Sequence, residues 1–267
     1  MVAMARNNVR VTGVGSRPML FAHGFGCDQG MWRHVAPAFE ADHRVVLFDH
    51  VGAGASDSAA YDPLKYGSLG GYTDDVLEIC DELDLRDVVF VGHSVSAMIG
   101  VLAAVRRPDR FSRLVLVGPS PRYIHDVDYI GSFERRDIEG LLELLDSNHM
   151  AWSSMMAPVI MGNPDRPELG AELTASFCRT DPALARRFAR VTFLSDNRAD
   201  LPKVRTPALI LQCAQDAIAP EVVGEYMHRN LAGSTLVKLR ATGHCPNLSA
   251  PAEVVAEIRG YLTGEAA

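Results

Sequence analysis

Apolar residues follow two recurring patterns along this chain: short unbroken runs, and longer stretches with the spacing of a helix. The short runs predict strands that are buried on both faces. These runs occupy residues 9–11 (the weakest), 19–22, 44–49, 88–91, 114–117, 208–213 and 235–239. Helical spacing occurs between them, at 69–85, 222–231 and 251–262. Because strands and helices alternate, we expect an α/β fold with a mostly parallel sheet and helices on both faces.

The middle of the chain has a different pattern. Residues 119–201 contain no clear buried strand, but they carry four amphipathic helical patterns separated by turn signals. These patterns cover residues 138–145, 151–160, 168–177 and 182–193. We therefore predict an α/β core formed by residues 1–118 and 202–267, interrupted by a helical lid of residues 119–201.

Ser94 lies in the most informative stretch, which reads VVFVGHSVSAMIG over residues 88–100. A buried strand leads directly into the serine, and an Ala-rich helical pattern follows it. This is the context of a nucleophile elbow, in which a sharp turn exposes the serine hydroxyl above the sheet edge. Ser96 stands where such elbows usually have glycine, and it meets the requirement for a small residue.

A serine hydroxyl needs a general base, and the base needs an acid to orient it. In an α/β-hydrolase sheet these residues follow in the order Ser, Asp or Glu, His. Asp216 comes just after strand 208–213 and His244 just after strand 235–239, at the strand ends where open α/β sheets place their sites. We predict Ser94 as nucleophile, His244 as base and Asp216 as its partner. The rival carboxylates in the insert, Asp196 and Asp200, are interpreted as capping or surface residues.

An oxyanion hole is also required. The backbone N–H of Val95 is one expected donor, and the N–H of Phe25, in the HGFG loop after strand 19–22, is the other. We expect His23 to brace this loop and His93 to serve in packing. For Cys245, next to the predicted base, a pocket role and a purely structural role both remain open.

Composition excludes several partner classes. The chain has 267 residues, 48% of them hydrophobic, and a formal net charge of −7, without Lys/Arg blocks. This argues against nucleic acid or an anionic membrane as partner, and no apolar run approaches the ~20 residues of a membrane span. Five scattered cysteines lack metal-ligand spacing, so we expect no metal, no cofactor and reduced thiols. No secretory signal is visible, and we expect a cytoplasmic monomer or weak dimer.

With these residues in place, the chain resembles a branch of the α/β-hydrolases: the RsbQ-like bacterial stress regulators and, more distantly, the plant karrikin and strigolactone receptors. The middle and C-terminal stretches are most similar to the RsbQ-like proteins, whereas Ser96 is similar to the plant receptors. The matching stretches are 23–29, 49–54, 92–100, 106–108, 118–123, 163–168, 177–182 and 243–246. They span nearly the whole chain, including the insert.

The resemblance implies a V-shaped lid of four helices over an apolar pocket. The positions that match the pocket lining are Phe25, Phe133, Trp152, Met156, Phe193 and Ile218. For the lid aromatics, packing between lid helices is an equal alternative. An apolar pocket favours a small hydrophobic ester or lactone, such as a butenolide.

The resemblance also leaves the purpose of the chemistry open. One hypothesis is a hydrolase of small esters or lactones. The second is a ligand sensor that regulates a partner protein, such as a PAS-domain phosphatase. A third and weaker hypothesis is a lyase or a cofactor-free oxygenase on the same scaffold.

Overall fold

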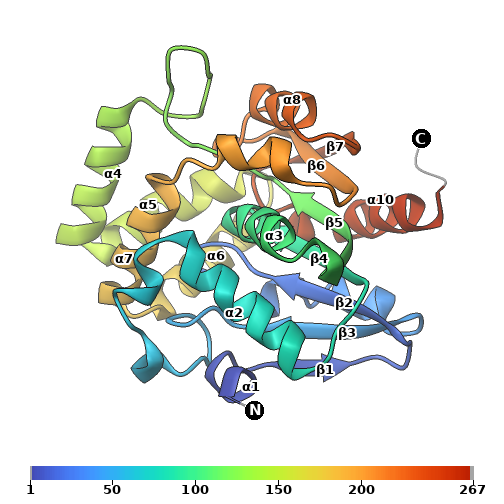
Figure 1. Ribbon diagram of the computed structural model, residues 1–267. Coiled ribbons are helices and arrows are strands. Elements are labelled where there is room, and N and C mark those ends of the chain that lie inside the picture. The colour runs from blue at the N-terminus through green and yellow to red at the C-terminus, as the bar shows by residue number, and fades with distance from the viewer. Residues whose placement is uncertain (1, 265–267) are drawn as a thin grey trace.

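The computed structural model describes residues 2–264, and within them seven strands form one sheet. The strand order is β1-β3-β2-β4-β5-β6-β7; β1 runs antiparallel to β3, and all other neighbours are parallel (Figure 1). The strands are β1 (Arg10–Thr12), β2 (Arg17–Ala22), β3 (His43–Phe48), β4 (Val88–His93), β5 (Phe111–Val117), β6 (Ala208–Gln215) and β7 (Ser234–Thr242). The predicted α/β-hydrolase fold is confirmed, and the weak opening strand lies one residue further along than expected.

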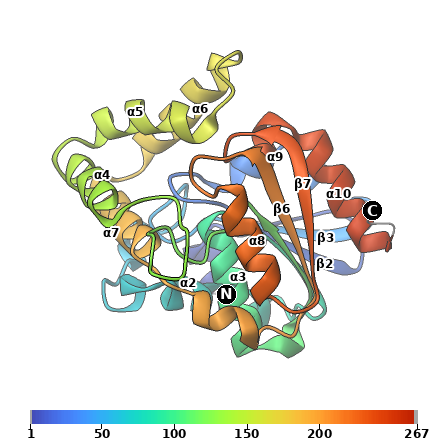
Figure 2. The same cartoon turned by 90° about the horizontal axis from the view of Figure 1, so that it is seen from above.

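Helices cover both faces of the sheet, and each face has its own apolar core. Leu20 and Phe90 pack toward α2 (Leu69–Glu82), α3 (Val95–Arg106) and α8 (Glu221–Asn230). Their neighbours Phe21 and Val91 point the other way, toward residues 29–39 and α10 (Pro251–Thr263). Figure 2 shows the two helical layers on opposite sides of the sheet. Because both faces are buried, the strands read as unbroken apolar runs.

The four helices predicted for the middle of the chain lie together at one end of the sheet (Figure 2). They are α4 (Arg135–Ser147), α5 (His149–Met161), α6 (Pro167–Arg179) and α7 (Pro182–Phe193). We call these four helices the lid. The division of the chain at residues 118/119 and 201/202 stays a prediction.

Short helical elements complete the architecture. Two are α-helical, α1 (Val2–Arg6) and α9 (Pro246–Ser249). Six are 3₁₀ turns, at Gln29–Trp32, Ala36–Phe39, Ser58–Ala60, Lys65–Gly67, Pro108–Arg110 and Arg198–Lys203. Among residues 2–264, none of the helices combines the length and apolar character that crossing a bilayer would require.

Candidate active site

Ser94 adopts a backbone conformation that residues with a side chain rarely take. It stands between β4 and α3 with φ 55° and ψ −121°. Its N–H donates to the carbonyl of Val117 on β5 (2.8 Å), and its own carbonyl accepts from the N–H of Ala97 (2.9 Å). Conformations of this kind cost roughly 1–3 kcal/mol and persist where surrounding contacts enforce them, often at functional sites. The sharp turn expected at the elbow is therefore present.

Ser94, His244 and Asp216 form a continuous hydrogen-bonded line. His244 Nε2 lies 2.7 Å from Ser94 Oγ, and His244 Nδ1 lies 2.7 Å from Asp216 Oδ2. The other carboxylate oxygen, Oδ1, accepts from the N–H groups of Ile218 (2.8 Å) and Ala219 (3.0 Å). With Nδ1–H donating to the carboxylate, Nε2 is left to accept the proton of Ser94. All three side chains are buried.

The loop that carries His244 has to pass the ends of β6 and β5 to reach Ser94, because both strands lie between β7 and β4 in the sheet. Gly118, the residue after β5, leaves this space open. A Cβ at that position would lie 3.2 Å from His244 Cε1, and the φ of +56° also favours glycine. The glycine thus permits the contact between strands that are not neighbours.

His93 holds the backbone of the predicted base. Its Nε2–H donates to the carbonyl of His244 at 2.7 Å. Complete burial, reinforced by the nearby His244, lowers the pKa of His93 to about 3, so this imidazole is neutral. We expected His93 to serve in packing rather than in catalysis; the structure adds a hydrogen bond that holds the His244 loop.

The two predicted oxyanion donors come from two separate segments of the chain. Phe25 follows β2 in the HGFG loop, and Val95 is the first residue of α3. Within the described residues, neither N–H donates to a protein group. Both amides are therefore available to an oxygen atom bound near Ser94.

A buried polar network fixes the loop just before Phe25. His23 accepts from the N–H of His50 (3.0 Å) and donates through Nδ1 to the carbonyl of Gly24 (2.9 Å). Ser96 Oγ donates to the carbonyl of His23 (2.5 Å) and accepts from His50 Nε2–H (2.7 Å). Burial lowers the pKa of both imidazoles, which are therefore neutral. The bracing role expected of His23 is present, and Ser96 at the elbow's glycine position joins the network.

A small cavity of about 20 Å³, with room for about one water molecule, lies over Ser94. Its walls are mostly apolar and come from both the core and the lid. The lining residues are Phe25, Cys27, His93, Ser94, Tyr123, Ile160, Leu173, Phe177, Thr192, Phe193, Ile218, His244 and Cys245. In the described part of the chain, the hydroxyl of Thr192 is buried without a hydrogen-bond partner, whereas the buried hydroxyl of Tyr123 lies beside Ser94.

The predicted pocket residues divide into two groups. Phe25, Phe193 and Ile218 line the cavity, whereas Phe133, Trp152 and Met156 do not. The Trp152 ring instead packs edge-on behind Phe25, with 5.8 Å between ring centroids. The Phe133 backbone is tied to Tyr123 through an N–H···O bond of 3.0 Å. Sequence reasoning missed Tyr123 and Thr192, for which the only signal was their position near the end of β5 and the end of α7.

The remaining candidates have structural partners. Asp196 pairs with Arg122 (2.6 Å) and Asp200 pairs with Lys203 (2.8 Å), so both belong to surface ion pairs.

Cys245 is buried and also lines the cavity, which combines the two roles left open for it. Burial raises the pKa of the Cys27 thiol to about 12 and that of Cys245 well above its ordinary value. Both thiols are therefore protonated and weakly nucleophilic.

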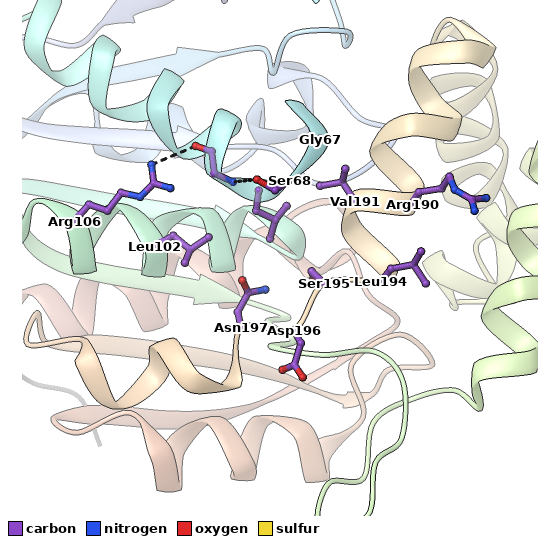
Figure 3. Close-up of a pocket in the computed structure, with 12 residues that line it drawn as sticks. Gly67, Ser68, Leu102, Arg106, Arg190, Val191, Leu194, Ser195, Asp196 and Asn197 are labelled. Atoms are coloured by element: carbon purple, nitrogen blue, oxygen red, sulfur yellow. Dashed lines mark hydrogen bonds between the residues drawn. The ribbon is translucent and has the colours of Figure 1, made fainter. Parts of the chain in front are cut away.

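A larger open groove lies elsewhere, between the start of α2, helix α3 and the end of α7 (Figure 3). None of the residues that line this groove also lines the cavity over Ser94. Its two guanidinium groups already have acidic partners: Arg106 pairs with Asp74 (2.6 Å) and Arg190 with Asp146 (3.6 Å). The apolar cavity over Ser94 is therefore the better candidate for chemistry.

The chain is also similar to proteins of a known family. The model of the alpha/beta hydrolase family matches residues 19–258. The chain belongs to this family. The solved structure of olei00960, a hydrolase from Oleispira antarctica, superposes on this hydrolase with a TM-score of 0.95 at 42% identity, covering 98% of this chain and 96% of the other.

Two plant relatives match this hydrolase over almost its full length. Karrikin insensitive 2 receptor CA from Petunia hybrida is 41% identical over 250 residues, 93% of each chain. Strigolactone esterase D14 from Arabidopsis thaliana is 42% identical over 256 residues, 96% of each chain. The predicted resemblance to the karrikin and strigolactone receptors is confirmed, while the nearer resemblance to the RsbQ-like proteins stays a prediction.

The buried histidines predict that the hydrolase loses stability as the pH falls below about 6.5, the ordinary pKa of histidine. The pKa values of His23, His50 and His93 are lowered in the folded state, so only the unfolded chain takes up these protons. For each histidine that stays neutral in the folded state, the free energy of unfolding falls by up to ~1.4 kcal/mol per pH unit below pH 6.5. Urea unfolding at pH 7, 6 and 5 measures this loss, and equal unfolding free energies at pH 7 and pH 5 would contradict it.

Proposed function

We propose that this protein is a serine hydrolase of small apolar carboxylic esters or lactones that acts through an acyl-enzyme on Ser94. The observation that carries the proposal is the pair of 2.7 Å contacts that joins Ser94 to His244 and His244 to Asp216 beside an apolar cavity. The family match and the relative named as an esterase support it.

In the first half of the reaction, Ser94 Oγ attacks the carbonyl carbon while His244 Nε2 takes its proton. The oxyanion that develops accepts hydrogen bonds from the N–H groups of Phe25 and Val95; a donor of this kind typically contributes ~3–4 kcal/mol. His244 then gives its proton to the departing alkoxide oxygen, and the acyl group remains on Ser94. Asp216 stabilises the imidazolium and keeps its Nδ1–H in place.

In the second half, water replaces the leaving group. His244 Nε2 takes a proton from the water as it attacks the acyl carbon, and Ser94 leaves with that proton. For a lactone, the alcohol and the acid produced are parts of one opened molecule.

The cavity favours a compact, uncharged substrate. Its walls are chiefly aromatic and aliphatic, which favours a small apolar molecule such as a butenolide, and the cavity of about 20 Å³ has to widen to admit it. The buried hydroxyl of Thr192 would be paired by an oxygen of the ligand, which favours a substrate with a polar atom beyond the reacting carbonyl.

We also propose a cytoplasmic location. The five cysteines are free thiols in the structure, which favours a reducing compartment.

Replacing the nucleophile tests the proposal directly. Ser94→Ala is expected to lower kcat for a small activated ester by at least ~10⁴-fold, because no other group can form the acyl-enzyme. Far-ultraviolet circular dichroism should show an unchanged fold. Ser112→Ala, a serine at the opposite end of the sheet, is the matched control and should retain full activity. An unchanged rate in Ser94→Ala would overturn the proposed triad.

A second candidate function is a ligand sensor that retains the same chemistry. It is favoured by the relative named as a receptor. The closed site is a further argument, since Ser94 is only 6% exposed and a bound ligand would be slow to leave. The outer face of α5 also exposes Met150, Met155 and Val159, which a partner protein would cover. A PAS-domain phosphatase is the proposed partner in that case.

Turnover separates the two functions. For the hydrolase we expect product formation from a butenolide ester to continue linearly well beyond one equivalent of enzyme. Release of a single equivalent, followed by a lasting increase in Tm, would instead favour the sensor. Ser94→Ala supplies the reference in this assay, because it binds the ligand without cleaving it and so reports the Tm shift of binding alone.

A further inference from the structure

The turn between lid helices α5 and α6 lies directly against the loop that carries His244. The N–H of His244 donates to the carbonyl of Ile160, in the last turn of α5, at 2.8 Å. Gly243 approaches the same helix so closely that a Cβ on it would lie 1.8 Å from the carbonyl oxygen of Met161. The backbone of the lid therefore touches the backbone of the His244 loop directly at these two points.

Asn163 lies at the centre of this contact. Its Nδ2 donates to two carbonyls, that of Met161 in the lid and that of Thr242 at the end of β7, both at 2.9 Å. Its Oδ1 accepts from the guanidinium of Arg166 at 2.5 Å. The residue is 92% buried and has a φ of 58°, a conformation that asparagine tolerates better than most residues. The amide thus joins the lid to the residue two places before His244.

Arg166 extends the contact to the other side of the His244 loop. While one of its nitrogens bonds Asn163, another donates to the carbonyl of Ser249, the last residue of α9, at 2.8 Å. The loop is therefore held by the lid turn both before His244, at Thr242, and after it, at Ser249. We call Asn163 and Arg166 the lid clamp.

The core holds the same loop from below. The carbonyl of His244 accepts from His93 (2.7 Å), and the N–H of Gly243 donates to the carbonyl of Gln215 (2.6 Å). These two bonds do not involve the lid. Without the lid clamp, the loop would stay attached to the core and to the Ile160 carbonyl, but it would lose its side-chain bonds to the lid at Thr242 and Ser249.

We infer that Asn163 and Arg166 are positioning residues that hold the His244 imidazole in place. The turn between lid helices α5 and α6 would then help to support the general base. The inference rests on the proposed function of His244. Nε2 has to stay within hydrogen-bond distance of Ser94, and a misplacement of about 1 Å can cost on the order of 100-fold in rate. Seating of the lid and competence of the triad are then coupled through three hydrogen bonds from the lid segment to the loop, and two more within that segment hold the clamp itself.

Asn163→Ala tests this inference. It is expected to lower the single-turnover acylation rate by about 10- to 100-fold with KM little changed, because the cavity walls remain. The matched control is Asn148→Ala, at the opposite end of α5, where the side chain accepts from the N–H of Ala151 (3.0 Å) and does not contact the His244 loop. This control should keep the wild-type acylation rate. Equal losses in both variants would overturn the inference in favour of general lid stability.

A spectroscopic readout makes the test independent of turnover. The proton of His244 Nδ1, bonded to Asp216, should give a far-downfield NMR resonance in the wild type that broadens in Asn163→Ala and stays sharp in Asn148→Ala. A sharp resonance together with a wild-type rate in Asn163→Ala would overturn the inference. Arg166→Met, which should broaden the resonance in the same way, keeps the test valid if Asn163→Ala does not fold.

The two readouts also separate this inference from the proposed function. A wild-type protein that neither hydrolyses esters nor acylates Ser94 would contradict the proposed function alone. The dependence of the His244 resonance on Asn163 would still decide whether the lid positions the imidazole.

Discussion

The site depends on one contact, the 2.7 Å hydrogen bond between His244 Nε2 and Ser94 Oγ, whose residues are 150 positions apart. The parallel order of the strands brings the ends of β4, β6 and β7 to one edge of the sheet. Gly118 leaves the space through which the imidazole passes over β5, and Asp216 fixes the ring from the far side. The strained backbone of Ser94 is tolerated because neighbouring backbone groups bond to it on both sides.

The lid combines two physical roles. It supplies apolar walls to the cavity through Ile160, Phe177 and Phe193. The end of α5 and the turn that follows it also form hydrogen bonds with the loop that carries the proposed base. An enzyme and a sensor can share such an arrangement, because any ligand that changes the seating of the lid also changes the chemistry beneath it.

Much of this architecture could be predicted from the sequence, because burial on both faces of a parallel strand leaves an unbroken apolar run and loops at strand ends carry the polar chemistry. The lining of the cavity was less predictable. Trp152, Met156 and Ile160 share one face of α5, yet only Ile160 reaches the cavity, since the angle between helix and core is set by packing with distant elements. The hydrogen bond from His93 to His244 joins residues 151 positions apart, and no local sequence pattern predicts it.

The most direct test of the account is the mass of the covalent intermediate. The protein would be mixed with a small activated ester, quenched in acid within the first turnover, digested and analysed by mass spectrometry. We expect one acyl group, located on the peptide that contains Ser94 and absent from Ser94→Ala. An acyl group found only on another residue, such as Cys27 or Cys245, or product formation without any acyl-enzyme, would contradict it.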